Sequence, residues 1–306
     1  MNDPASSTRD AVAAQLAALS APEAPLNTDS PRNTTRLYAT SIRRRVFGKT
    51  VIDRYLDTAP TPPREGRSAL ITAGPPGAGK STLLSQQIAD LQDYRRLDAD
   101  IVKDHLIRQA VTDGIYGDLL ERVLADGHPI ATRELAALVH HESTALIDQI
   151  RRICTDRREN VLIEGTLRWP DQGRRRLAEL AAADYTSVRV IGVEVPRALA
   201  HEQAVQRWWM VRNQWIAGVD DLGGRYTPPA APIPVTPAQA HGRSAPTTPP
   251  RSPTTRPLTV LRSRSLSTSA SRTALLSSRS PDRPVLRHLR LRDRHHTRCP
   301  PRPRRR

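Results

Sequence analysis

The segment AGPPGAGKST, residues 73–82, carries the clearest chemical signal in the sequence. Gly74, Gly79, Lys80 and Ser81 satisfy the P-loop pattern G-x-x-x-x-G-K-[ST] in full. Glycines reach backbone conformations closed to other residues, so such a loop wraps closely around phosphate oxygens at the start of a helix. Lys80 would bridge the β- and γ-phosphates of ATP, and the Ser81 hydroxyl would hold Mg²⁺. The expected nucleotide-binding residues are Gly74, Pro75, Pro76, Gly77, Ala78, Gly79, Lys80, Ser81 and Thr82.

The alternative for this segment is a Gly/Pro turn that happens to contain a lysine. The chain has only three lysines in 306 residues, so a chance match to the pattern is rare. The flanks also fit, because SALITA (68–73) predicts a short apolar strand and KSTLLSQQIADLQ (80–92) predicts an amphipathic helix. Strand, glycine loop and helix follow in the order that a P-loop requires.

Two acidic residues stand where a second strand is expected to end. Asp98 and Asp100 in the segment LDAD come at a strand-to-helix corner. Phosphoryl transfer to a hydroxyl needs an acceptor for the hydroxyl proton, and a carboxylate can serve. The alternative for Asp100 is a helix N-cap, a position that Asp favours. We expect Asp100 to be the base and Asp98 to lie near Mg²⁺ or its water ligands.

A third strand is expected to run into the segment IEGTLR, residues 163–168. Glu164 would accept hydrogen bonds from sugar hydroxyls, Thr166 would offer a small donor, and Arg168 would bind a phosphate as a fork. For Glu164 the alternative is a pair with a structural arginine, and the sequence leaves both interpretations open.

Two further arginines are expected near the phosphates. Arg207 and Arg212 lie five residues apart on a predicted helix, so at most one of them faces the site. Arg225 follows Gly223 and Gly224, which allow a close backbone approach. Mobile arginines that close over phosphates shield phosphoryl transfer from water.

Strands and helices alternate along the chain, which predicts an α/β fold. The predicted strands are 68–73, 95–99, 160–164 and 187–195. The predicted helices lie near 35–57, 80–92, 101–111, 115–125, 131–155, 171–183 and 197–217. Apolar strands separated by helices indicate a mainly parallel sheet covered on both faces, a P-loop kinase-like three-layer sandwich. Ligands of such sheets bind at the carboxyl ends of the strands.

The composition changes after residue 226. Residues 1–226 contain 30 Lys+Arg and 29 Asp+Glu, whereas residues 227–306 contain 17 Arg, two acids, 15 of the 27 prolines and no aromatic residue. Such a tail cannot bury enough apolar surface to offset the entropy of ordering. We expect a disordered leader over 1–34, a P-loop kinase domain over 35–228 and a disordered Arg/Pro/Ser-rich tail over 229–306.

The basic tail has two interpretations. One is an arm that binds nucleic acid through its phosphates. The other is out-of-frame translation of GC-rich coding DNA, because the change of composition is abrupt. A nucleic-acid partner is expected only under the first.

The remaining features exclude several classes of protein. Cys154 and Cys299 are the only cysteines and lie far apart, so neither a disulfide framework nor a metal pattern follows. The N-terminus has acidic residues before a short Ala/Leu run, which fits neither a signal peptide nor a membrane span. We expect a cytoplasmic protein without a membrane partner.

The ordered set GPPGAGKST, LDAD, NVLIEGTLR, VEVPRALAHEQAVQR and GGRYTPP resembles the zeta toxin family, the P-loop kinases of toxin–antitoxin systems. The similarity covers roughly residues 35–228. It implies ATP-dependent phosphorylation of the sugar 3′-hydroxyl of UDP-N-acetylglucosamine, with a separate antitoxin protein as a partner. The residues that it implies as catalytic are Lys80, Asp100, Arg207 and Arg225. The residues that it implies as substrate-binding are Glu164, Thr166 and Arg168.

The chain departs from the family after Arg225. The family continues there into helices and a closing strand, whereas GGRYTPPAAPIPVTPAQ passes into the basic tail. We therefore expect the kinase domain to lack its final strand. Two other functions stay open: a related P-loop phosphotransferase for another hydroxyl, such as an antibiotic or a polynucleotide 5′ end, and a non-catalytic RNA-binding protein that uses the tail. The near-neutral charge of residues 1–226 argues against a polynucleotide acceptor.

Overall fold

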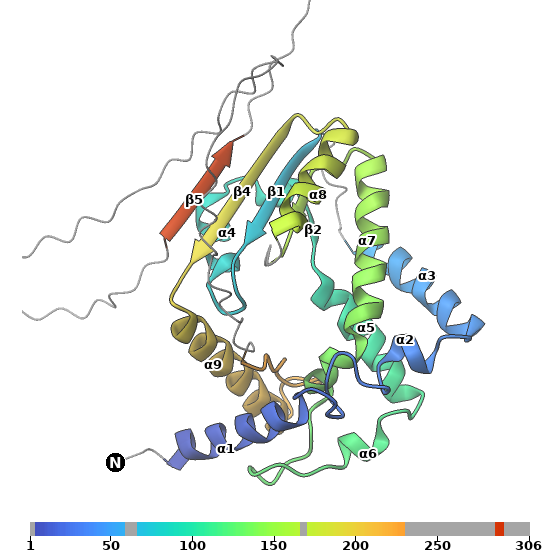
Figure 1. Cartoon of the computed structure of the whole chain (residues 1–306), viewed down its shortest axis with the longest axis vertical. Helices are drawn as coiled ribbons and strands as arrows, with labels where there is room; N and C mark the ends of the chain where they lie inside the picture. Colours follow the sequence, from blue (N-terminus) through green and yellow to red (C-terminus); the bar gives the residue numbers. More distant parts are fainter. Residues whose placement is uncertain (1–3, 59–65, 166–169, 230–284, 291–306) are drawn as a thin grey trace, which may run out of the picture.

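A sheet of four parallel strands and one antiparallel edge strand forms the centre of the computed structural model, which describes residues 4–58, 66–165, 170–229 and 285–290 (Figure 1). The strand order is β2-β3-β1-β4-β5, and β5 runs antiparallel to β4. The strands are β1 (Ser68–Ala73), β2 (Arg95–Leu97), β3 (Val161–Ile163), β4 (Ser187–Glu194) and β5 (Val285–Arg290). The predicted α/β class with a mainly parallel sheet is confirmed.

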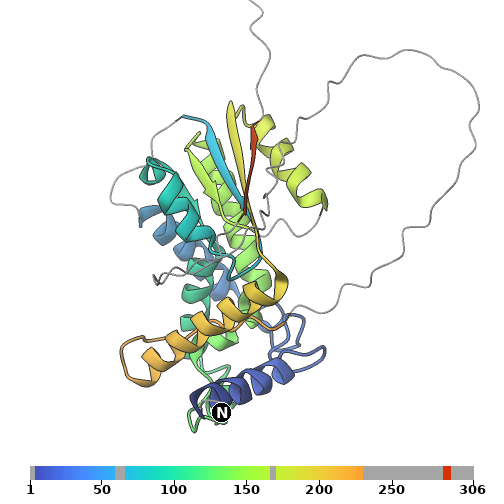
Figure 2. The same ribbon diagram turned by 90° about the vertical axis from the view of Figure 1, so that its left-hand side faces the viewer.

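Helices connect the strands and cover both faces of the sheet (Figure 2). The α-helices are α1 (Pro4–Leu19), α2 (Thr34–Leu37), α3 (Ile42–Asp57), α4 (Lys80–Gln87), α5 (Ala99–Thr112), α6 (Gly117–Leu120), α7 (His140–Asp156), α8 (Pro170–Ala182) and α9 (Arg197–Ile216). The 3-10 helices are η1 (Leu91–Asp93) and η2 (Thr132–Val139). The carboxyl ends of β1 and β4 point toward α9 (Figure 1).

Alternation along the strands gives the sheet two buried faces. In β1, Ala69 and Ile71 belong to the larger core, together with residues of α3, α5 and α7. Leu70 points to the other face and packs in a smaller core with Leu83 and Leu84 of α4. Successive side chains of a strand point to opposite faces, so a continuous apolar strand is buried on both sides. In this three-layer arrangement the P-loop lies where the carboxyl ends of the parallel strands meet.

Several predicted helices differ in extent from those observed. The helix expected over 35–57 is interrupted because Ser41 caps α3, its side chain accepting a hydrogen bond from the Arg44 N–H. The helix expected over 80–92 ends at Gln87, where Ile88 turns to an extended conformation and is buried. The segment expected to be one helix over 131–155 starts as the 3-10 helix η2 and continues as α7.

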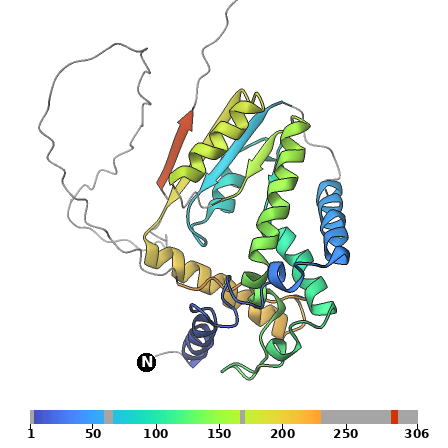
Figure 3. The same cartoon turned by 45° about the vertical axis from the view of Figure 1, so that its right-hand side comes forward.

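The disordered leader expected over residues 1–34 is wrong for the residues that the structure describes there. Val12 and Leu16 of α1 are fully buried in the larger core. The Tyr226 hydroxyl donates to the Ala13 carbonyl at 2.9 Å, and Arg9 pairs with Glu202 of α9 at 2.9 Å. Residues 12, 16 and 19 lie on one face of a helix, so an apparently frayed Ala/Leu run forms a buried stripe beside α9 (Figure 3).

Most of the predicted tail lies outside the described residues, so its expected disorder stays a prediction there. The described part, Val285–Arg290, forms β5 and pairs with β4 from Arg189↔Arg290 to Glu194↔Val285. For these six residues the structure differs from the expected disorder, and the sheet has an edge strand beyond β4. The exposed backbone edge of a strand is a template for pairing, which another segment of the same chain can use.

Candidate active site

The P-loop joins the carboxyl end of β1 to α4. Gly74, Gly77 and Gly79 have φ values of 151°, 83° and 80°. Residues with a Cβ rarely adopt these backbone conformations. A Cβ on Gly77 would lie 2.2 Å from the Ala200 carbonyl oxygen, so the loop packs directly on α9. A Cβ on Gly79 would meet no atom of the described residues within 4 Å. The backbone at the start of α4 is therefore open to a ligand, and its geometry fits a phosphate.

The other P-loop residues divide between the core and the surface. Ala78 is buried beneath α4, in the smaller core. Pro75 and Pro76 are exposed, as are Ser81 and Thr82 in the first turn of α4. The two hydroxyls are thus accessible at a helix N-terminus, where an anion and its counterion would lie.

Lys80 lies at the centre of the charges at this edge of the sheet. Its ammonium donates to the carbonyl oxygens of Gly74 at 2.8 Å and Pro75 at 2.9 Å. Burial lowers the pKa of Lys80, with Arg207 acting in the same direction and Glu164 and Asp100 opposing. The structure therefore places Glu164, Asp100 and Arg207 within electrostatic reach of Lys80.

The cap of α5 is Asp98, not Asp100. The Asp98 carboxylate accepts a hydrogen bond from the Asp100 N–H at 2.9 Å and pairs with Arg96 at 3.5 Å. These contacts place Asp98 in the corner between β2 and α5, where we expected a group near Mg²⁺. Asp100 stands one residue inside the helix with its side chain 46% exposed, so its carboxylate is not used for capping.

Two cations hold the Asp100 carboxylate. Lys103, one turn further along α5, approaches it at 3.0 Å, and Arg225 approaches it at 2.8 Å. Burial opposes ionisation of Asp100, but Lys103, Arg225 and the more distant Arg207 outweigh it and hold the pKa of Asp100 below its ordinary value. Asp100 is therefore ionised at neutral pH.

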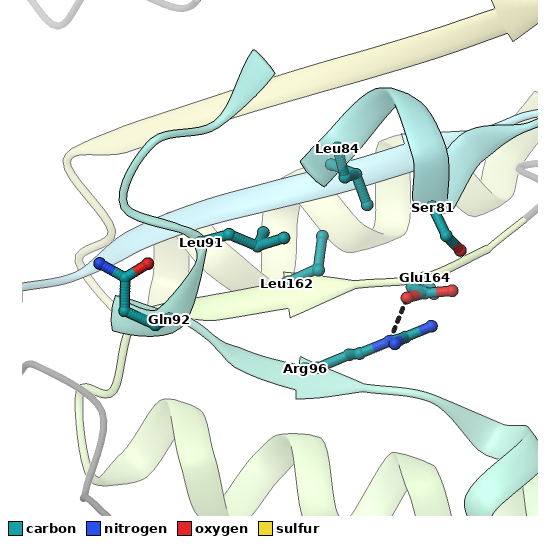
Figure 4. Close-up of a pocket in the computed structure, with 7 residues that line it drawn as sticks. All are labelled: Ser81, Leu84, Leu91, Gln92, Arg96, Leu162 and Glu164. Carbon is teal, nitrogen blue, oxygen red and sulfur yellow. Dashed lines mark ion pairs between the residues drawn. The ribbon is translucent and has the colours of Figure 1, made fainter. Parts of the chain in front are cut away.

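Glu164 lines a cavity of about 280 Å³ between α4 and the strands β2 and β3 (Figure 4). It forms an ion pair with Arg96, whose side chain is 51% exposed. Burial raises the pKa of Glu164, with the Arg96 pair opposing. The cavity is lined by Ser81, Leu84, Leu91, Gln92, Arg96, Leu162 and Glu164. The pairing of Glu164 with an arginine, one of the two interpretations that the sequence left open, is present, but that arginine is half-exposed and borders the cavity.

Thr166 and Arg168, the other two residues expected to bind the substrate, lie outside the described residues.

Arg207 and Arg212 lie on different sides of α9. Arg212 is fully buried and pairs with Glu134 and Asp126 at 2.8 and 2.7 Å. Arg207 is exposed, and among the described residues it has no hydrogen-bond or ion-pair partner. Of the two, only Arg207 acts on Lys80 and Asp100.

The loop that carries Arg225 is seated firmly on two other elements. A Cβ on Gly224 would lie 2.1 Å from the Trp208 carbonyl oxygen of α9, and one on Gly223 would lie 2.5 Å from the Ala131 side chain. The two glycines thus permit close packing on protein and do not face the P-loop. Arg225 itself is 24% exposed and contacts Asp100 and Asp104 of α5.

Three charged residues of this site were not predicted from the sequence: Lys103, Asp104 and Arg133. Asp104 contacts Arg225 at 2.7 Å and Arg133 at 3.0 Å. Lys103 could have been singled out from the sequence, because it is one of only three lysines and lies one helical turn after Asp100. No sequence pattern points to Arg133 or Asp104, since their partners are distant in the sequence.

Neither a metal cluster nor a membrane helix is found in the described part of the chain. It contains no group of three His, Cys, Asp or Glu side chains that could hold a metal ion. Nor does any of its helices combine the length and apolar character needed to cross a bilayer.

The family model for zeta toxins matches residues 52–235 of this chain. No match was found among curated proteins. Two solved structures show weak similarity. The PezAT chromosomal toxin–antitoxin system of Streptococcus pneumoniae aligns with 17% identity and a TM-score of 0.44, over 57% of this chain and 66% of that chain. The AvrRxo1-ORF1:AvrRxo1-ORF2 structure with sulphate ions aligns with 15% identity and a TM-score of 0.40, over 60% of this chain and 52% of that chain.

The family match covers more than half of the chain, including β1, the P-loop and every residue placed at the site above. The chain therefore belongs to the zeta toxin family of P-loop kinase-like phosphotransferases.

Proposed function

We propose that this protein transfers the γ-phosphoryl group of ATP to the 3′-hydroxyl of the amino sugar in UDP-N-acetylglucosamine. The observation that carries the proposal is the gathering of Lys80, Asp100, Glu164 and Arg207 at the carboxyl ends of parallel strands and the adjoining helices. A P-loop lysine, an ionised carboxylate and a free arginine are the groups that phosphoryl transfer to a hydroxyl requires.

The nucleotide half of the site is the P-loop and the first turn of α4. Backbone N–H groups of residues 77–81 would receive the β-phosphate, and Lys80 would leave the Gly74 and Pro75 carbonyls to bridge the β- and γ-phosphates. Ser81 would hold Mg²⁺, which neutralises charge on the phosphate oxygens. The expected residues from Gly74 to Thr82 keep these roles in the proposal.

Asp100 is the proposed base. As the acceptor oxygen bonds to the γ-phosphorus, its proton passes to an Asp100 carboxylate oxygen and the bond from the γ-phosphorus to the bridging oxygen of ADP breaks. Lys103 and Arg225 keep Asp100 ionised, so the base is available at neutral pH. Arg207, exposed and without a partner among the described residues, is free to meet charge on the phosphoryl oxygens.

The acceptor half of the site is proposed at Glu164, beside the cavity of Figure 4. A carboxylate at a strand end accepts hydrogen bonds from sugar hydroxyls, and the half-exposed Arg96 is able to exchange its partner for a phosphate of the acceptor. Thr166 and Arg168 are proposed as further acceptor-binding residues. A separate antitoxin protein is proposed as a partner because the chain belongs to the zeta toxin family.

The test is a panel of acceptors incubated with ATP labelled in the γ-phosphate. The panel contains UDP-N-acetylglucosamine, UDP-glucose, a chloramphenicol-like alcohol and an oligonucleotide with a 5′-hydroxyl. We expect label on UDP-N-acetylglucosamine and none with Lys80→Ala, which lacks the charge that stabilises the migrating phosphoryl group. Label on the oligonucleotide alone would contradict the proposal.

A further inference from the structure

Arg133 connects the loop that carries Arg225 to helix α5. Its guanidinium donates to both carboxylate oxygens of Asp220 at 3.1 Å and to the Gly223 carbonyl at 3.2 Å. It also donates to Asp104 at 3.0 to 3.1 Å. The Arg133 N–H donates to the Leu222 carbonyl at 2.8 Å. One residue of η2 therefore fixes the loop and α5 relative to each other.

The loop is also fixed from within. The Asp220 carboxylate accepts hydrogen bonds from the N–H groups of Leu222 at 2.8 Å and Gly223 at 2.6 Å. Gly223 and Gly224 then pack against η2 and α9 at distances that leave no room for a Cβ. The backbone that leads into Arg225 therefore has a defined position.

Asp104 is shared by the two arginines. One of its carboxylate oxygens lies 2.7 Å from Nη2 of Arg225, while Arg133 occupies both oxygens from the other side. The second terminal nitrogen of Arg225, Nη1, reaches Asp100 at 2.8 Å. The Arg225 guanidinium is thus held between the carboxylate of the proposed base and a carboxylate one turn along the same helix.

We propose that Asp104 is a positioning residue that holds the Arg225 guanidinium beside Asp100, and that Arg133 holds Asp104 for this purpose. This inference rests on the proposed function, because it assigns Asp104 a role in that same phosphoryl transfer. A planar guanidinium held by two carboxylates keeps one orientation, and a fixed cation beside the reacting groups needs no reorganisation when charge develops there.

A second ion pair between the same two elements provides the matched control. Arg108 of α5 pairs with Asp221 of the loop at 3.4 Å, with side chains 52% and 80% exposed. This pair joins α5 to the loop as Asp104 does but touches neither Arg225 nor Asp100. If Asp104 serves only to attach the loop, removing either pair should have similar consequences for activity.

The experiment measures steady-state transfer by Asp104→Asn, Asp221→Asn, Arg225→Gln and the double variant Asp104→Asn/Arg225→Gln. We expect kcat to fall about 10- to 100-fold for Asp104→Asn, with the KM for ATP nearly unchanged, because the cation is misplaced in the transition state. Asp221→Asn should match the parent. The double variant should lose no more activity than Arg225→Gln alone, because Asp104 acts through Arg225.

An additive loss in the double variant would overturn the proposal, as would an unchanged kcat for Asp104→Asn. A second measurement does not depend on activity. The ¹⁵N relaxation of the Arg225 Nε–H group should give an order parameter above roughly 0.8 in the parent and Asp221→Asn, and below roughly 0.6 in Asp104→Asn. Arg133→Lys serves in place of Asp104→Asn if that variant does not fold. If the parent transfers no phosphate, the proposed function fails, and the relaxation alone then decides whether Asp104 positions Arg225.

Discussion

Two clusters of arginines and carboxylates lie on either side of η2. They contain the same kinds of side chain, but we assign them different roles. In the buried cluster, Arg212 and Glu134 have fully buried side chains and Asp126 is 5% exposed. In the rim cluster, formed by Asp100, Asp104, Arg133 and Arg225 at the edge of the sheet, every side chain is 22 to 46% exposed. The two clusters therefore differ in solvent exposure more than in their residue types.

The buried cluster is saturated with hydrogen bonds. Arg212 donates to both carboxylates and to the carbonyls of His128 and Pro129, while Glu134 also accepts from the Trp208 indole and the Ala131 N–H. In the half-exposed rim cluster, Nε of Arg225 has no hydrogen-bond partner among the residues that the structure describes. A saturated buried network fixes structure, whereas a half-exposed network can exchange partners with a ligand.

Consecutive residues of η2 separate the clusters. Arg133 points to the rim cluster and Glu134 to the buried one. Trp208 of α9 links them as well, because its indole donates to Glu134 and its carbonyl lies against Gly224. The buried cluster thus supports the surface on which the Arg225 loop rests. We expect changes in the rim cluster to reduce activity with only a small loss of stability, and changes in the buried cluster to reduce stability far more.

The largest effect on activity is expected for Asp100→Asn. The amide keeps the shape of the side chain but accepts no proton, so kcat should fall about 10²- to 10⁴-fold while ATP binding persists. Steady-state kinetics and a nucleotide-binding titration measure the two. The control is Asp118→Asn, which removes an exposed pair with Arg32 and should leave kcat unchanged. Loss of ATP binding itself in Asp100→Asn would show that Asp100 has a structural or metal-binding role.

The largest effect on stability is expected for Arg212→Met. It leaves Glu134 and Asp126 buried without their cation, which costs about 3–5 kcal/mol of unfolding free energy. Urea unfolding measures this against Arg108→Met, where an exposed arginine is lost and the change should stay below about 1 kcal/mol. Equal losses in the two variants would contradict the distinction between buried and exposed clusters.

Arg207→Gln tests the exposed arginine that acts on Asp100 from α9. If Arg207 meets charge that develops on the phosphoryl oxygens, kcat should fall by about 10²-fold with little change in the KM for the acceptor. Arg197→Gln on the same helix is the comparison for loss of positive charge in general. A rise in the acceptor KM at constant kcat would instead assign Arg207 to acceptor binding.

The sequence predicted the parts of the site that follow local patterns. The P-loop and the strand ends beside it were found because glycine spacing and apolar runs mark them directly. The cap at Asp98 was not predicted, because the cap was considered only for Asp100; both residues stand at a strand-to-helix corner, and only the backbone at the end of β2 decides which side chain accepts from the helix.

The partners of Arg225 could not be predicted from local patterns. Asp104 contacts Arg225 from 121 residues away, and Arg133 contacts Asp104 and the Gly223 carbonyl, by a packing arrangement that no short segment encodes. The burial of α1 depends in the same way on the surface that Tyr226 and α9 present to it.

The smallest expected effect concerns the pH dependence of the rim cluster. Lys103 and Arg225 hold the pKa of Asp100 below its ordinary value, so the base stays ionised to a lower pH than a free carboxylate would. Lys103→Met removes one of these cations and should raise that pKa, moving the acidic limb of the kcat/KM profile to higher pH.

The same pairing of Asp100 with Lys103 and Arg225 stabilises the folded state above the ordinary carboxylate pKa. This stabilisation is lost as the pH falls through the lower, folded-state pKa. As the pH falls through this range, the parent should therefore lose more of its unfolding free energy than Lys103→Met, in which the Asp100 pKa is less depressed. Lys49→Met, an exposed lysine of α3, should leave both profiles in place. An acidic limb that does not move with Lys103→Met would mean that a group other than Asp100 titrates, and His140, whose pKa is lowered by burial and by Lys103, would be the next to test.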